Sequence, residues 1–143
     1  MVTSLQTEQL SQVISHATAP SFLLGAVAGF VSVLIGRMNQ VLERIRSIND
    51  IADTDLNRRQ LKADLPRLAQ RAALLNRAIF LAVNSAIAAT LLVIIAFASA
   101  MLGRHHEPGA ALIFVIALAL LGSSLFTLAR EVRIALNQYD HYQ

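Results

Sequence analysis

The chain has 143 residues, of which 55% are hydrophobic and 15% are charged, and its formal net charge is +3. With a mean hydropathy of +0.55, it is too apolar and too poor in charge to be an ordinary soluble domain. Because it contains no cysteine, disulfides, thiolate chemistry and cysteine metal sites are excluded.

Three long segments of the chain carry no charged residue. They contain 28, 26 and 22 residues and lie between Glu8 and Arg37, between Arg77 and Arg104, and between Glu107 and Arg130. A helix rises about 1.5 Å per residue, so about 20 residues cross the hydrocarbon core of a bilayer. We therefore predict an all-α integral membrane protein with three transmembrane helices, at about 13–36, 78–102 and 110–129.

These helices set the predicted domain organisation. Residues 1–12 are polar and are expected to form a loosely ordered N-terminal tail. The three-helix membrane domain is expected at 13–137, followed by a C-terminal tail at 138–143. No Lys or Arg precedes the first apolar segment, which argues against a removable signal peptide.

One face of the first predicted helix consists of small residues spaced by three or four positions: Ser21, Gly25, Gly29, Ser32 and Gly36. Small residues let helix backbones approach closely in lipid. Three roles fit this face, which we call the small-residue face: packing against the second or third helix, a seam between copies of the chain, or the lining of a pore.

Segment 37–77 continues the helical pattern beyond the first span. Apolar residues recur every three or four positions in two arms, at Met38, Val41, Leu42, Ile45 and Ile48, and at Leu61, Leu65, Leu68, Ala72, Leu75 and Ile79. This spacing is typical of helices that pair through heptad seams. We predict that the first two spans extend into a coiled-coil hairpin at 37–77.

Local signals predict where the hairpin helices end. The turn is expected at residues 49–55, with Asp53, Thr54 or Asp55 as the N-cap of the returning helix. Pro66 cannot donate a backbone hydrogen bond, so a kink or a new helix start is expected near Asp64.

Polar side chains are few in the second and third predicted helices. Asn84 lies deep in the second, where an interhelical hydrogen bond is its expected role and a ligand or ion contact the alternative. A group in the third is expected to serve packing: Gly122, Ser123, Ser124 and Thr127.

The predicted outer turn, residues 103–109, contains His105, His106 and Glu107, with Pro108 and Gly109 ending it. Adjacent histidines in a turn rarely chelate one ion in good geometry, so we predict no metal site and an exposed polar turn.

Lys and Arg lie almost entirely on one side of the predicted spans. Segment 37–77 holds nine of the twelve, the C-terminal segment two, the outer turn one and the N-terminal tail none. Short loops rich in Lys and Arg stay in the cytoplasm. We therefore predict an N-terminus outside, with the hairpin and the C-terminus in the cytoplasm.

Three arginines fall where the predicted spans meet the inner surface: Arg37, Arg77 and Arg130. They are expected to anchor the topology and contact lipid headgroups, or to form an anion-favouring collar if the chain assembles into a ring. Glu43 and Glu131 are expected to pair with arginines of neighbouring helices rather than to act as catalytic acids.

Three motifs resemble a known family. They are G-R-M-N-Q-V-L-E-R-I-R-S-I-N at 36–49, R-A-A-L-L-N-R-A-I at 71–79 and L-A-R-E-V-R-I-A-L at 128–136. In this order they resemble a bacterial family catalogued as domain of unknown function 2721, over roughly residues 13–137. The resemblance implies a small inner-membrane protein without an established activity, and it carries over no catalytic or binding residue.

The sequence disfavours three functional classes: proton-coupled transporters, enzymes and nucleic-acid-binding proteins. The middle of each predicted span lacks ionisable residues, which disfavours proton-coupled transport. The sequence contains no glycine-rich phosphate loop and no nucleophile paired with a base, so we predict neither an enzyme nor a cofactor. The basic loop alternates in charge sign and lacks aromatic residues, which disfavours nucleic acid.

Two functional hypotheses remain. The first is a non-enzymatic membrane protein that acts through helix association, as a homo-oligomer or as an accessory subunit of a membrane complex. The alternative is a passive homo-oligomeric ion channel, favouring anions if the arginines line its inner mouth. In both, the expected partners are the lipid bilayer and either further copies or another membrane subunit.

Overall fold

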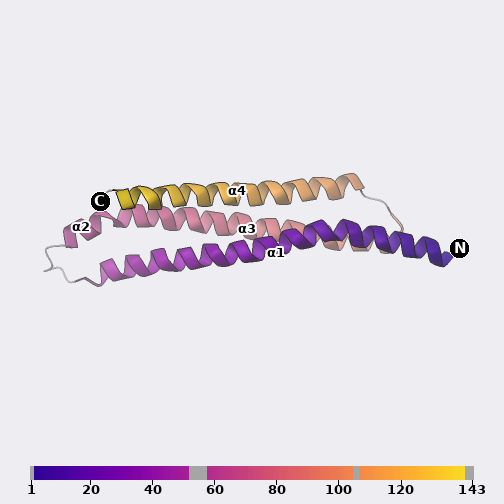
Figure 1. The fold of residues 1–143 in the computed structure, drawn as a ribbon, viewed down its shortest axis with the longest axis horizontal. Coiled ribbons are helices and arrows are strands. Elements are labelled where there is room, and N and C mark those ends of the chain that lie inside the picture. Colours follow the sequence, from indigo (N-terminus) through magenta and orange to yellow (C-terminus); the bar gives the residue numbers. More distant parts are fainter. Residues whose placement is uncertain (1, 52–57, 105–106, 141–143) are drawn as a thin grey trace. The chain divides into compact units, whose positions relative to one another are not determined.

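The computed structural model describes residues 2–51, 58–104 and 107–140, which form helices and no strand (Figure 1). The helices are α1 (Val2–Asn49), α2 (Arg58–Ala63), α3 (Leu65–Met101) and α4 (Glu107–Asp140). Three of them, α1, α3 and α4, are long and apolar enough to cross a membrane. The prediction of an all-α chain with three such helices is therefore confirmed.

The N-terminal segment is helical, where the sequence analysis expects a loosely ordered tail. α1 begins at Val2 and continues through Pro20 without a break. Residues 2–12 contain Leu, Gln and Glu, which favour helices, and the hydroxyl of Thr7 donates to the carbonyl of Thr3 in the same helix. Pro20 therefore lies inside a long helix.

The chain divides into two compact units, and each unit contains parts of α1, α3 and α4. Unit 1 consists of Met1–Phe30 and Ala82–Gly122. Unit 2 consists of Val31–Leu81 and Ser123–Gln143, and it also contains α2.

Buried residues follow a heptad pattern on α3. Seven buried residues, together with half-buried Arg71 between the first two, are spaced alternately by three and four positions. The buried ones are Leu68, Leu75, Ala78, Ala82, Ser85, Ala89 and Leu92. A mean period of 3.5 residues keeps one narrow stripe of a helix against its neighbours. Four consecutive members of this stripe are Ala or Ser, which permits close helix packing.

The other two long helices carry matching stripes. On α1, buried residues recur at intervals of seven: Pro20, Val27, Leu34, Val41 and Ile48. On α4, Ala117, Ser124 and Glu131 do the same, with Thr127 buried between the last two. Each long helix therefore turns one stripe inward and leaves most of its apolar surface exposed.

Unit 2 contains the two predicted arms together with a third helix. The six seam residues predicted for the returning arm are all buried or half-buried, as expected for a face that packs against neighbouring helices. α4 continues from Ala129 to Asp140, about three turns farther than the predicted span. Glu131 hydrogen-bonds to both α1 and α3 in this unit, so the arms form a three-helix arrangement instead of a two-helix hairpin.

The predicted break before Pro66 is confirmed. α2 ends at Ala63 and α3 begins at Leu65, so Pro66 stands in the first turn of a new helix. The amide of Asp64 donates to the carbonyl of Leu61, and the carbonyl of Asp64 accepts from Leu68. The predicted N-cap residues Asp53, Thr54 and Asp55 lie outside the described residues.

Two local features mark the other helix ends. α3 ends in a Schellman motif, in which the amide of Gly103 donates to Ala100 and the amide of Arg104 donates to Ser99. Gly103 has a φ of 64°, a left-handed conformation that glycine adopts most readily. α4 already begins at Glu107, so Pro108 and Gly109 belong to its first turn rather than to a breaker outside the helix.

Candidate functional site

An ion cluster joins the three long helices within unit 2. The Glu131 side chain of α4 is fully buried, and its carboxylate binds two arginines. Arg37 of α1 donates through Nε and Nη2 to Oε2, at 2.9 and 2.7 Å. Arg71 of α3 donates through Nε to Oε1 at 2.8 Å. One carboxylate is thus held by three charge-assisted hydrogen bonds from two helices.

The helices position these side chains through the heptad stripes. Arg71 lies three residues after Leu68 and four before Leu75, which are both buried. Glu131 likewise occupies a stripe position on α4, seven residues after Ser124. The arginine side chains keep 31% and 18% of their surface exposed, for Arg37 and Arg71 respectively, so their aliphatic stems pack while part of each side chain reaches solvent.

The sequence predicts the role of Glu131 but not which arginines it pairs with. It expects pairing with arginines of neighbouring helices, and the structure gives these as Arg37 and Arg71. Arg71 could have been predicted as a partner from the sequence, because it occupies a heptad position between Leu68 and Leu75. Glu43 is exposed on α1, and its backbone carbonyl accepts a hydrogen bond from Ser47.

Two serines connect α3 and α4 directly. In unit 1, Ser85 of α3 donates to the carbonyl of Ala117 at 2.7 Å. In unit 2, Ser124 of α4 donates to the carbonyl of Ala78 at 2.6 Å. All four residues are buried, and the two pairs are one heptad apart on each helix. Within unit 2, the same step of seven residues leads from Ala78 and Ser124 to Arg71 and Glu131, so one antiparallel register describes these two contacts.

The small-residue face of α1 is exposed in the part of the chain that the structure describes. Ser21, Gly25, Gly29, Ser32 and Gly36 are all exposed. A Cβ added at any of the three glycines would meet no atom within 4 Å. The described residues thus give this face no contact with the second or third helix, and α1 buries Val27 and Leu34 on another side instead. Packing, a seam between copies and a pore lining remain the predicted roles of the face.

The remaining predicted residues occupy varied positions. Asn84 is half-buried on α3. On α4, Thr127 is buried and donates to the carbonyl of Ser123 in its own helix, whereas Gly122 is exposed. Arg77 and Arg130 are exposed.

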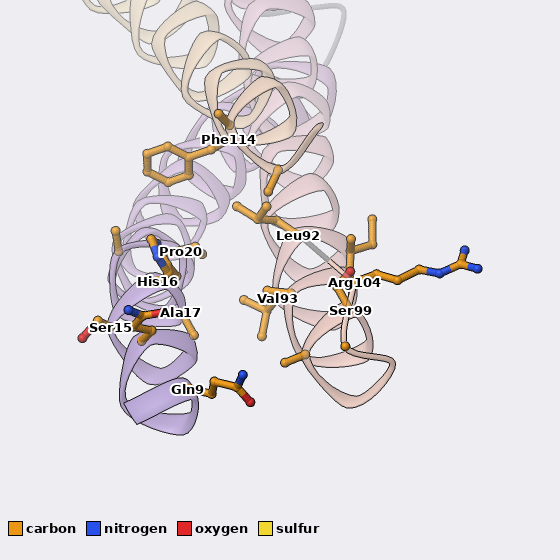
Figure 2. Close-up of a pocket in the computed structure, with 18 residues that line it drawn as sticks. Gln9, Ser15, His16, Ala17, Pro20, Leu92, Val93, Ser99, Arg104 and Phe114 are labelled. Atoms are coloured by element: carbon orange, nitrogen blue, oxygen red, sulfur yellow. The ribbon is translucent and has the colours of Figure 1, made fainter. Parts of the chain in front are cut away.

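A cleft of about 520 Å³ lies within unit 1, between the N-terminal half of α1 and the adjoining ends of α3 and α4 (Figure 2). Its apolar wall includes Pro20, Leu92 and Phe114, and its polar lining includes Gln9 and His16. In Figure 2 the side chain of Arg104 extends away from the cleft. The arrangement is a mainly apolar groove with polar groups at its margin.

No cluster of three or more metal-ligating side chains occurs among the described residues. His105 and His106, the histidines considered as ligands in the outer turn, lie outside that part of the chain.

Comparison with known proteins identifies a family. The profile of a protein family of unknown function, DUF2721, matches residues 17–141, nearly the whole chain. The chain belongs to the DUF2721 family. No match to it was found among curated proteins or solved structures. The family assignment confirms the resemblance drawn from the motifs at 36–49, 71–79 and 128–136, but it brings no activity with it.

Proposed function

We propose that this DUF2721 protein is a non-enzymatic, multi-pass protein of the bacterial inner membrane that acts through helix association. Its N-terminus would lie outside and its C-terminus in the cytoplasm, as the distribution of Lys and Arg favours. It would work as a homo-oligomer or as a small accessory subunit of a membrane complex.

The exposed small-residue face is the observation that carries this proposal. Gly29 lies two residues beyond Val27 of the α1 stripe, and Gly25 lies two residues beyond buried Leu23, a rotation of roughly 200° around the helix in each case. α1 therefore has an inward stripe for its own chain and a second, closely approachable face directed away from it. Faces of this kind support helix contacts in lipid.

The limited burial of the long helices also supports association. In the most apolar 18-residue windows of α1, α3 and α4, only 22%, 28% and 17% of residues are buried. Most of the apolar side chains must then be covered by lipid or by other helices. A second helix against the small-residue face would cover part of that surface.

The first test is the mass of the complex after gentle extraction from native membranes. A defined homo-oligomer or hetero-complex is expected for the wild type. Gly29→Leu should dissociate it, and Gly122→Leu is the matched control, since Gly122 is an exposed glycine of α4 with equally open surroundings. A wild-type monomer, or an unchanged complex in Gly29→Leu, would contradict the proposal.

The channel hypothesis is tested on the same face. Because the chain lacks cysteine, Gly25→Cys, Gly29→Cys and Ser32→Cys each introduce a single thiol. A seam between helices keeps these thiols inaccessible to a water-soluble maleimide in membranes and permits disulfides between copies. Rapid labelling of all three would instead favour a water-filled pore lined by this face.

A further inference from the structure

The ion cluster of unit 2 carries an excess of positive charge. Two guanidinium groups, of Arg37 and Arg71, share the single carboxylate of Glu131. Among the described residues, Glu131 is the acidic partner that the structure gives to either arginine. The side chain of Arg71 is only 18% exposed, so water screens its charge incompletely. A partly buried charge in excess of its partners is stabilised by a further counter-ion.

The cluster also has hydrogen-bond donors to spare. A guanidinium carries five N–H groups in a planar fork. Arg71 uses Nε toward Glu131, and Arg37 uses Nε and Nη2. The contacts with Glu131 thus leave both Nη groups of Arg71 and Nη1 of Arg37 for an oxyanion. Phosphate suits such forks because it offers several acceptor oxygens around one centre.

The position of the cluster in the chain identifies the source of that phosphate. Arg37 directly follows the 28 uncharged residues of α1, and Glu131 follows Arg130, which ends the uncharged segment of α4. The Arg37 side chain itself keeps 31% of its surface exposed, so part of it is accessible to a ligand. In the proposed topology this level is the inner membrane surface, where lipid phosphates are concentrated.

We propose that Arg37 and Arg71, oriented by Glu131, form a binding site for the phosphate group of an anionic phospholipid in the inner leaflet. Glu131 positions both guanidiniums and neutralises one of them, and the headgroup phosphate neutralises the other. This inference rests on the proposed membrane insertion but is independent of helix association.

The test measures lipid binding by the full-length chain in a neutral detergent. Phosphatidylglycerol and phosphatidylcholine are titrated separately, and retained lipid is counted by native mass spectrometry. We expect one tightly held phosphatidylglycerol per chain and about tenfold weaker binding in Arg71→Gln, the effect of losing roughly one charge-assisted hydrogen bond. Arg133→Gln, which changes an exposed arginine of α4, is the matched control and should bind like the wild type.

A second variant keeps the site testable if Arg71→Gln fails to fold. Glu131→Gln keeps the length of the side chain but only one acceptor oxygen, so one arginine keeps its partner and the other loses it. Because the competing negative charge is removed, phosphatidylglycerol should bind more tightly. A cluster with a purely structural role predicts no such gain.

Several results would overturn the site. Equal binding of phosphatidylglycerol by the wild type and by Arg71→Gln would exclude the site. Retention of phosphatidylcholine by the wild type as strongly as phosphatidylglycerol would also exclude it. If inorganic phosphate stabilised the chain at least as much as phosphatidylglycerol does, the site would be assigned to a soluble anion. Loss of self-association in Arg71→Gln without an effect on lipid would assign the excess charge to an acidic group of a second copy. Recovery of the chain from the soluble fraction would refute the membrane assignment itself, whereas a membrane-extracted chain without bound lipid refutes this site alone.

Discussion

Arg37 of α1 and Glu131 of α4 stand 94 residues apart in the chain, yet Arg37 Nη2 lies 2.7 Å from Glu131 Oε2. Arg71 of α3 binds the other oxygen of the same carboxylate. A single buried side chain thereby ties the three long helices together within unit 2, and it does so just beyond the apolar segments of α1 and α4.

Removing the carboxylate should strongly destabilise the chain. Glu131→Ala leaves two partly buried guanidiniums without their partner, and breaking a buried ion pair in this way costs about 3–5 kcal/mol. Partial exposure of the arginines places the expected loss near the lower end of that range. Unfolding by increasing SDS in mixed micelles, followed by circular dichroism, measures it. Glu43→Ala, at an exposed site on α1, is the control and should change little. Equal stability of the two variants would show that the cluster does not hold unit 2 together.

The interhelical serine bonds should contribute modestly. Ser85→Ala removes the donor to Ala117 and Ser124→Ala removes the donor to Ala78, and each should cost about 0.6 kcal/mol, the average for such bonds in membrane bundles. Thr90→Ala is a suitable control, because Thr90 is exposed and donates within its own helix to Ala86. The same SDS titration applies, and a larger loss in the control than in either serine variant would contradict the assigned register.

Enlarging the small residues of the α3 stripe should disrupt packing. Ala82→Leu places extra volume at a position with no exposed surface, and overpacking of this kind costs typically 1–3 kcal/mol. Ala98→Leu makes the identical change at an exposed position of the same helix and should stay within about 0.5 kcal/mol of the wild type. The comparison is made by resistance to trypsin in detergent, where only Ala82→Leu is expected to be cleaved faster.

The end of α3 should depend on one glycine. Gly103→Ala forces a Cβ into the left-handed region at φ 64°, at a cost of about 1–2 kcal/mol. Gly109→Ala, in the first turn of α4, meets no neighbouring atom and has no such backbone constraint. We expect it to be neutral or slightly stabilising in thermal unfolding. Matching losses in the two variants would argue against the Schellman motif.

The two termini should lie on opposite sides of the membrane. Three membrane crossings would put the two ends on opposite sides, and the excess of Lys and Arg in segment 37–77 predicts a cytoplasmic C-terminus. In inverted and right-side-out vesicles, a short epitope tag at each end reports protease access. Each preparation should expose one tag and protect the other, and simultaneous protection of both tags would contradict the topology.

Much of the fold could be predicted because the signals are local. An apolar segment of 22 to 28 residues specifies a helix of membrane-spanning length through its own composition. The break at Asp64 follows from the missing amide of Pro66, and the seam from Leu61 to Ile79 follows from its period. The helical state of residues 2–12 was missed, since polar composition alone does not distinguish a solvated helix from a tail.

The site was harder to predict, as the small-residue face illustrates. Gly25 and Gly29 form a regular stripe, and so do Ala78, Ala82, Ser85 and Ala89 on α3. Both stripes permit close helix approach. The structure buries the second and exposes the first, a choice that depends on how each helix is rotated about its own axis.

The sequence by itself thus determined the number, length and period of the helices and the family to which the chain belongs, because composition, spacing and motifs are properties of neighbouring residues. Only the tertiary structure decided that Glu131 binds Arg37 and Arg71 and that Ser85 meets Ala117. The physical reason is that these contacts join residues at least 32 positions apart. They depend on the rotation and register that packed helices adopt together, which no single segment specifies.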